Sequence, residues 1–483
     1  MTEAAAAGPD PRRWKALAVL SIAYLMVVLD VSIVNVALPS IQTDLDFAPE
    51  DLQWVVSGYA LTFGGFLLLG GRVGDLLGRR RLFMIGLGLF AACSLLCGLS
   101  TSPGMLIAAR LFQGAAGAIL SPSVFSIVSV TFEEGSERNK ALGILGAIAG
   151  SGAAIGVLLG GILTEYAGWE WIFFVNAPIG VATLFFVPRL VRESRAHDLA
   201  QHFDATGAVT VTASLMLLVY GLTQTTNVGW TSGRTIGVLI GSAVLMAAFL
   251  VVEARSRSPL VPLGFFRRRT NSGANLIGFG LGTMIFGMFF LLSLYMQQVL
   301  GFSALETGVG YLAVALVAVA SSGVSQALVT RAGVKPVLVV GLLLLSGGLL
   351  WFTQVSENGS YAVDLLPGFL LIGVGLGFSF VPISIAALAG VTGREAGLAS
   401  GLINTSQQIG GALGLAVLAT VSTTHTESLL ADGTARPQAL TEGFSLAFWV
   451  ALAFAAVSIA TTLAVLRRQD LRVETEAPAP VVP

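Results

Sequence analysis

Charge is scarce in this chain of 483 residues, in which Asp, Glu, Lys and Arg make up 11%, against about 25% in soluble domains. Cysteine is scarcer still, because Cys93 and Cys97 are the only two, and both lie in one apolar run as small packing residues. A disulfide-stabilised secreted scaffold is therefore excluded. The net charge of −1 excludes a basic nucleic-acid-binding surface, and the 55% of hydrophobic residues exclude a soluble enzyme.

Lysine and histidine are also rare. The only lysines are Lys15, Lys140 and Lys335, and none follows a glycine, so the phosphate-binding loop of an ATP-driven pump is absent. The three histidines fall in predicted loops, and no group of His, Cys and carboxylate side chains gathers in the apolar runs. We therefore expect no catalytic residues, no metal site and no cofactor.

Long apolar runs are what the chain has in abundance. Each is long enough for a helix to cross the hydrocarbon of a bilayer, which takes about 20 residues. The first is too long for a cleaved signal peptide and is expected to be a permanent helix. The sequence predicts fourteen spanning helices, over residues 16–39, 52–70, 82–99, 104–131, 140–164, 171–188, 206–225, 235–253, 272–299, 307–329, 336–354, 362–389, 398–422 and 444–466.

Basic residues predict the direction of these helices, because Arg and Lys near the ends of spans stay on the cytoplasmic side. With the N-terminus inside, 23 of the 26 basic residues fall in cytoplasmic segments. Arg234 and Arg436 fall in external loops, and Arg110 lies within a span. This alternation favours an even number of spans, with both termini cytoplasmic. The segment from Thr423 to Glu442 is expected to be the longest external loop, and it shows no signal of a helix that would bind an adaptor protein.

An internal repeat indicates two related halves. Gly78 and Gly86 recur as Gly333 and Gly341, an offset of 255 residues, and other glycines recur at nearly the same offset. Parallel repeated halves around a central site are typical of transporters. We expect an all-α polytopic membrane protein with a cytoplasmic N-terminus (1–15), a six-helix bundle (16–188), a linker with two inserted helices (189–271), a second six-helix bundle (272–466) and a cytoplasmic tail (467–483).

A glycine-rich charged loop follows the second predicted span. It reads Gly71-Arg-Val-Gly74-Asp75-Leu-Leu-Gly78-Arg79-Arg80-Arg81 and resembles the loop signature of the major facilitator superfamily, with Leu76 where that pattern has a basic residue. Glycines allow close helix approach, and a carboxylate among arginines can break and re-form charged hydrogen bonds as bundles rock. We interpret it as a gating loop; the alternative is a positive anchor, for which Arg79 to Arg81 would suffice.

Four further motifs resemble the 14-spanning drug:proton antiporters of that superfamily, and together the motifs extend over essentially the whole chain. They are Leu29-Asp30-Val-Ser-Ile-Val-Asn35-Val-Ala-Leu-Pro39, Arg110-Leu-Phe-Gln113-Gly114, Gly152-Ala-Ala-Ile-Gly156-Val157-Leu-Leu-Gly160-Gly161, and Gly397 to Gly411 with Asn404 and Gln407. The third resembles the antiporter motif, with Val157 in place of the family proline. The resemblance implies a monomeric exporter of lipophilic drugs in a bacterial cell membrane, driven by the proton gradient.

Asp30 and Arg110 are the two ionisable residues well inside predicted spans. Such residues are costly in a bilayer and are usually functional. At about 1.5 Å per residue of helix, Asp30 lies roughly 13 Å and Arg110 roughly 9 Å from the outer ends of their predicted spans. We expect the two to meet, with Asp30 carrying the proton and Arg110, Gln113 and Asn35 adjusting its charge state. A static buried ion pair is the structural alternative.

Other polar residues on apolar spans are candidates for a substrate cavity: Asn35, Tyr59, Gln113, Gln297, Asn404 and Gln407. Asn404 and Gln407 share a helix face. Hydrogen bonding between helices accounts for such a face equally well. The scarcity of charge favours a largely apolar substrate. The alternative function is proton-coupled transport of an endogenous small metabolite, inward or outward.

Overall fold

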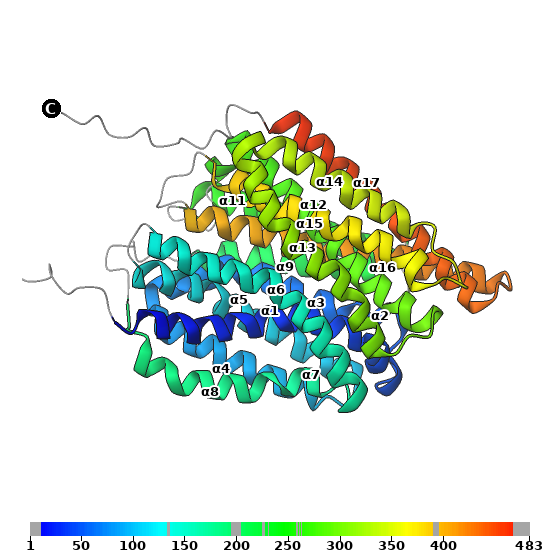
Figure 1. The fold of residues 1–483 in the computed structure, drawn as a ribbon, viewed down its shortest axis with the longest axis horizontal. Coiled ribbons are helices and arrows are strands. Elements are labelled where there is room, and N and C mark those ends of the chain that lie inside the picture. Colours follow the sequence, from blue (N-terminus) through cyan, green and yellow to red (C-terminus); the bar gives the residue numbers. More distant parts are fainter. Residues whose placement is uncertain are drawn as a thin grey trace, which may run out of the picture.

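The chain folds entirely into helices in the part that the structure describes, and Figure 1 shows no strand there. The structure is a computed structural model, which describes residues 11–132, 136–194, 204–224, 228–229, 231–256, 259, 261, 263–389 and 396–466. The helices are α1 (Arg13–Asp44), α2 (Pro49–Leu52), α3 (Trp54–Leu77), α4 (Arg79–Gly98), α5 (Pro103–Thr131), α6 (Ser136–Tyr166), α7 (Trp171–Phe174), α8 (Asn176–Leu190), α9 (Ala205–Thr223), α11 (Gly233–Arg255), the 3₁₀-helix η1 (Leu263–Arg267), α12 (Arg269–Leu294), the π-helix η2 (Tyr295–Val299), α13 (Ala304–Ala332), α14 (Val334–Phe352), the π-helix η3 (Tyr361–Leu365), α15 (Leu366–Leu388), α16 (Ala396–Ala431) and α17 (Arg436–Val465).

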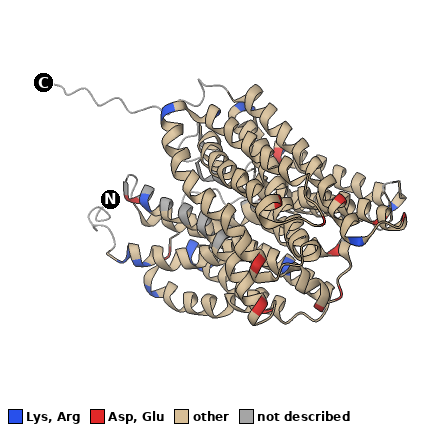
Figure 2. Ribbon diagram, turned by 45° about the vertical axis from the view of Figure 1, so that its right-hand side comes forward, with Lys and Arg blue, Asp and Glu red and all other residues tan. Residues whose placement is uncertain are grey.

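Many of these helices are long enough to span a membrane. Eleven are long and apolar enough to cross a bilayer, and shorter apolar stretches of α3, α6 and α9 bring the count in the described residues to fourteen. The predicted all-α polytopic fold with fourteen spans is therefore confirmed. The Lys and Arg residues gather mainly at the end of the molecule where α1 begins and α17 ends, as Figure 2 shows. We call this the termini end and the other the opposite end.

Two groups of helices form the body of the molecule. α1, α3, α4, α5, α6 and α8 pack together, as do α12 to α17. One buried apolar cluster lies wholly within the first group, whereas a second joins Ile33 to Ile41 of α1 to α12 and its neighbours. Because that part of α1 leads toward the opposite end, the two bundles share a core there.

The repeat seen in the sequence is also a repeat of geometry. Gly78 (φ 109°) separates α3 from α4, and Gly333 (φ 88°) separates α13 from α14, in a region of backbone space that favours glycine. A Cβ atom at Gly86 would lie 2.9 Å from the Leu120 nitrogen, and one at Gly341 would lie 2.6 Å from the Phe378 carbonyl carbon. The same glycine contact therefore joins α4 to α5 and α14 to α15.

The inserted pair, α9 and α11, lies against both bundles. Ser214 and Ser242 each donate a hydrogen bond to the other's carbonyl oxygen, both at 2.8 Å. α9 also packs on α3 and α16, which belong to different bundles. Thr212 reaches α3 through a hydrogen bond to the Gly65 carbonyl at 3.3 Å.

One prediction about a loop is wrong. The segment from Thr423 to Glu442 is mostly helical, because α16 continues to Ala431 and α17 begins at Arg436. The Ser, Thr, Leu and Ala residues before Gly433 are compatible with helix, and Gly433 (φ 86°) supplies the turn. The result is a helical hairpin that projects at the right of Figure 1.

Candidate functional site: a buried ion pair between helices

Asp30 and Arg110 form an ion pair inside the first bundle. Asp30 lies near the middle of α1 and is 0% exposed, and Arg110 of α5 is 1% exposed. Arg110 Nη1 lies 2.5 Å from Asp30 Oδ2. The contact expected from their depths is therefore present. A buried pair of this kind is tolerated only where further hydrogen bonds satisfy its remaining polar atoms.

The second carboxylate oxygen of Asp30 has two amide donors. Gln113 Nε2 donates to Asp30 Oδ1 at 2.7 Å, and Asn176 Nδ2 donates to the same atom at 3.2 Å. Gln113 lies one helical turn after Arg110 on α5, so the two side chains share a face. Asn176 begins α8. The carboxylate thus ties α1 to α5 and α8.

The guanidinium of Arg110 is held on several sides. Its Nε donates to the Val55 carbonyl of α3 at 2.9 Å, and its Nη1 donates to Gln113 Oε1 at 2.8 Å. The group lies 4.4 Å from the centre of the Tyr59 ring and 5.6 Å from that of Phe173, in cation–π range. Arg110 is therefore the centre of a polar cluster in an apolar bundle.

Two of the supporting residues were not foreseen from the sequence, namely Asn176 and Ser94. Asn176 also donates to Ser94 Oγ at 3.0 Å, and Ser94 donates to the Phe173 carbonyl at 2.9 Å. Cys97, interpreted only as a packing residue, donates to Gln113 Oε1 at 3.4 Å. The one available signal was Asn176 itself, an amide inside a predicted span.

Asn35, which we expect from the sequence to lie beside Asp30, does not join the cluster. Its Nδ2 donates within α1 to the carbonyls of Val31 and Ser32, at 3.1 and 3.4 Å. Five residues along a helix amount to about 140° of rotation, so Asn35 and Asp30 face different directions. Among the residues that the structure describes, Asn35 Oδ1 and the Tyr59 hydroxyl are buried without a hydrogen-bond partner. Of these two atoms, only the Tyr59 hydroxyl belongs to a residue that contacts Arg110.

The glycine face of α6 packs directly against the part of α1 that carries Asp30. A Cβ atom at Gly152 would lie 2.7 Å from Val28, one at Gly156 would overlap Ser32 Oγ, and one at Gly160 would lie 2.7 Å from the Ile33 carbonyl. Gly161 faces the other bundle, where a Cβ would lie 2.8 Å from the Ala304 carbonyl of α13. The predicted antiporter-type glycine helix therefore contacts both α1 and α13.

The predicted gating loop is only partly described. Gly71, Gly74 and Asp75 fall within α3, and the surroundings of this stretch, including the Asp75 side chain, lie outside what the structure describes. Beyond the break at Gly78, the Arg79 amide donates to the Ser194 carbonyl at 3.1 Å, and the Arg80 amide donates to Glu193 Oε1, also at 3.1 Å. Glu193, which the sequence did not single out, thus satisfies the start of α4.

The remaining cavity candidates separate. Gln297 Nε2 donates to the Val36 carbonyl of α1 at 2.8 Å, joining the two bundles, and the neighbouring Gln298 donates to Gln42 at 2.8 Å. Asn404 and Gln407 are half-buried on α16. None of the six predicted cavity residues lines either of the two pockets of about 320 and 300 Å³. The structure gathers Tyr59 and Gln113 at the ion pair and places the others elsewhere.

A polytopic helical protein with a buried ion pair and two repeated bundles is a membrane transporter in form, and the family comparison agrees. Residues 20–415 match the Major Facilitator Superfamily, so the chain belongs to this superfamily of transporters and is not an enzyme. It is 40% identical over 478 residues to the puromycin resistance protein pur8 of Streptomyces alboniger, which covers 98% of this chain and 94% of that protein.

Two further relatives and one solved structure are informative. The chain is 40% identical to the cephamycin export protein CmcT of Amycolatopsis lactamdurans, over 86% of each protein. It is 33% identical to the tetracenomycin C resistance and export protein of Streptomyces glaucescens, over 88% of this chain and 79% of that protein. A bacterial homologue of the lysosomal transporter Spinster, in an inward-facing conformation, shares the fold with a TM-score of 0.68 and 16% identity, over 98% of this chain and 100% of the other.

Proposed function

We propose that this chain is a monomeric antiporter that exports small, largely apolar antibiotics from a bacterium in exchange for protons. Three relatives carry antibiotic resistance or export in their names. The observation that carries the coupling mechanism is Asp30, a carboxylate buried at mid-helix whose two oxygens accept hydrogen bonds from Arg110, Gln113 and Asn176. The proton gradient is the only energy source required, and no cofactor is involved.

Protonation of Asp30 would act as the switch. A neutral carboxyl no longer balances the charge of Arg110. Leaving a buried charge without its partner destabilises that state by several kcal/mol. The links from α1 to α5 and α8 would weaken together, because the same carboxylate makes them. The bundles would then repack relative to each other, and alternating access follows from this change.

The orientation belongs to the same proposal. Basic residues gather at the termini end (Figure 2), which the positive-inside rule assigns to the cytoplasm. Near the opposite end the bundles are joined by Gln297 and Gln298. The arrangement supports a state that is closed on the outside.

Asp30→Asn tests the coupling. Asn keeps the shape of the side chain and one of its two acceptor oxygens, but it cannot bind and release a proton. In proteoliposomes we expect the variant to lose uphill drug transport driven by a pH gradient, while drug exchange down its own gradient continues. Asp30→Glu is the matched control and should recover part of the coupling. Unchanged pH-driven transport by Asp30→Asn would refute the assignment, and loss of exchange as well would favour a static structural ion pair.

A further inference from the structure

One apolar cavity lies away from the ion pair, where the inserted helices meet both bundles. Its volume is about 320 Å³. The walls come from α3, α9, α11, α16 and the segment before α12, and they are almost entirely apolar. Typical lining residues are Val211, Leu215, Phe249, Val261, Leu402 and Thr405.

The cavity lies in the half of the membrane nearer the termini end. Val211 follows the start of α9 at that end, and Leu402 follows the start of α16 there. Two residues of its rim, Leu250 and Phe266, are 45% and 38% exposed. In a bilayer, apolar side chains exposed on the outer surface of the helices would face acyl chains, and these two rim residues are of that kind.

Two buried polar groups shape this cavity. Thr405 Oγ1 lies in its wall, buried and without a hydrogen-bond partner in the described part of the chain. The carboxylate of Glu253, on α11, accepts a hydrogen bond from the Val261 amide at 3.2 Å. This bond holds the linker segment against α11 and so keeps the wall in place.

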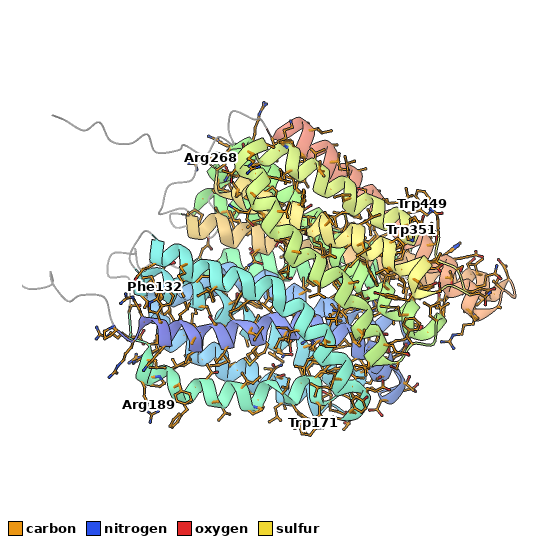
Figure 3. The ribbon with its side chains drawn as sticks, in the orientation of Figure 1. Phe132, Trp171, Arg189, Arg268, Trp351 and Trp449 are labelled. Atoms are coloured by element: carbon orange, nitrogen blue, oxygen red, sulfur yellow. The ribbon has the colours of Figure 1, made fainter. Side chains whose placement is uncertain are left out.

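Exposed arginines lie close in sequence to two lining residues of the cavity, Leu250 and Phe266. Arg255 ends α11, and Arg267 and Arg269 follow the lining residue Phe266. Figure 3 shows the neighbouring Arg268 at the termini end of the molecule. An apolar cavity beneath clustered arginines matches a molecule with an acyl chain and an anionic head group.

We propose that this cavity binds one acyl chain of an anionic phospholipid, with the lipid phosphate against Arg255 and Arg267. That the lipid comes from the cytoplasmic leaflet rests on the orientation proposed above; the binding itself does not. α3 and α16 touch beside the cavity, where a Cβ atom at Gly64 would lie 3.3 Å from Ile409 Cγ1. These helices belong to different bundles, so the lipid occupies a boundary that rocking would change.

The test measures binding of spin-labelled phosphatidylglycerol and phosphatidylcholine, with identical acyl chains, to the purified full-length protein. Val211→Trp fills the cavity and is expected to abolish the motionally restricted fraction of phosphatidylglycerol bound there. Val209→Trp is the matched control, because Val209 lies on the same helix but is 66% exposed. It should behave as the unmodified protein does. Thermal unfolding of both variants checks that they are folded.

The head-group contact is tested separately. The double change Arg255→Gln and Arg267→Gln should lower the preference for phosphatidylglycerol by about 25-fold, at roughly fivefold for each of the two arginines near a membrane surface. Arg331→Gln, also at the termini end, is the control.

Equal binding of the two lipids to the unmodified protein, or full binding to a folded Val211→Trp variant, would overturn the proposal. Competition by an exported drug alone, with no lipid effect, would make this a drug site and also overturn it. Asp30→Asn should keep the lipid preference, so failure of the antiport proposal is distinguishable.

Discussion

At the scale of single residues, the chemistry of arginine explains why position 110 is not simply a positive charge. The Arg110 guanidinium donates to a backbone carbonyl, a carboxylate and an amide oxygen, and its plane lies over Tyr59. A lysine ammonium is a compact point charge that cannot reproduce this planar set of contacts. The cluster therefore depends on shape as well as on charge.

Arg110→Lys is expected to keep the ion pair but lose the contact with Val55 and the stacking on Tyr59. We expect a loss of thermal stability of about 1–3 kcal/mol, the usual range when a buried polar partner is left unpaired, and a marked loss of drug transport. Unfolding in detergent and transport in vesicles measure the two effects. Arg331→Lys, at an exposed site in the last turn of α13, should change neither. Full stability and activity of Arg110→Lys would contradict the role given to its geometry.

Sequence reasoning reached the ion pair but not its supports. Ionisable residues inside apolar helices are rare, so Asp30 and Arg110 stood out, and helix geometry placed them at similar depth. Asn176 and Ser94 did not stand out, since small polar residues are common in membrane helices. Their roles depend on which helices are neighbours, and no spacing along the chain shows that.

At the scale of helices, the glycines of α6 allow this helix to pack directly against the backbone of α1 around Asp30. Gly156 meets Ser32 and the Leu29 carbonyl, and Gly308 of α13 lies where a Cβ would be 2.8 Å from the Val157 carbonyl. Val157 stands where the resembling motif has a proline, and here its carbonyl lies at the contact between bundles. Close packing thus survives without that proline.

Gly156→Ala should disturb this contact. The added methyl group overlaps Ser32 Oγ and would lie 3.0 Å from the Leu29 carbonyl oxygen, and overpacking of this kind costs about 1–3 kcal/mol. We expect a lower unfolding temperature and weaker transport. Gly104→Ala is the control, because a Cβ there meets nothing within 4 Å. A Gly156→Ala variant as stable as the Gly104→Ala variant would show that α6 can move away freely.

The predicted spans agree with the helices to within a few residues at most ends, because hydrocarbon thickness and apolar runs determine them together. The exception is the extension of α16 and α17 beyond the membrane. Hydropathy identifies only the apolar part of a helix, and the polar turns after Thr423 had no such signal. Their helical state follows from pairing with each other, as when Thr426 Oγ1 donates to the Ala439 carbonyl at 3.2 Å.

At the scale of the whole molecule, the bundles are joined near the opposite end. Gln297 and Gln298 donate to Val36 and Gln42, and α6 packs on α13 at Gly161 and Ala304. Among the described residues, side-chain hydrogen bonds at the termini end, such as the one from Arg13 to Glu137 at 2.8 Å, connect helices of the same bundle. The repeat in the sequence predicted two bundles, but their relative closure depends on contacts between residues some 260 positions apart.

Gln297→Ala combined with Gln298→Ala removes both inter-bundle hydrogen bonds and should favour the state open at the opposite end. Each bond is worth about 0.5–1.5 kcal/mol, so the ratio of the two states should change by roughly tenfold. Spin labels at Thr43 and Ala435, both exposed, report the separation. We expect the longer-distance population to grow. Gln438→Ala removes a glutamine that donates to Glu442 of its own helix, and it should leave this population unchanged. An unchanged distribution in the double variant would disprove the closing role.

The hairpin between α16 and α17 makes these motions easier to detect than the membrane body does. From Thr423 to Ala431 it adds about 13 Å of helix at 1.5 Å per residue. Since both arms continue helices of the second bundle, the hairpin is a lever rigidly attached to that bundle. A small rotation of the bundle produces a larger displacement at the tip around Gly433. A single fluorophore there would therefore report the conformational changes of the transport cycle.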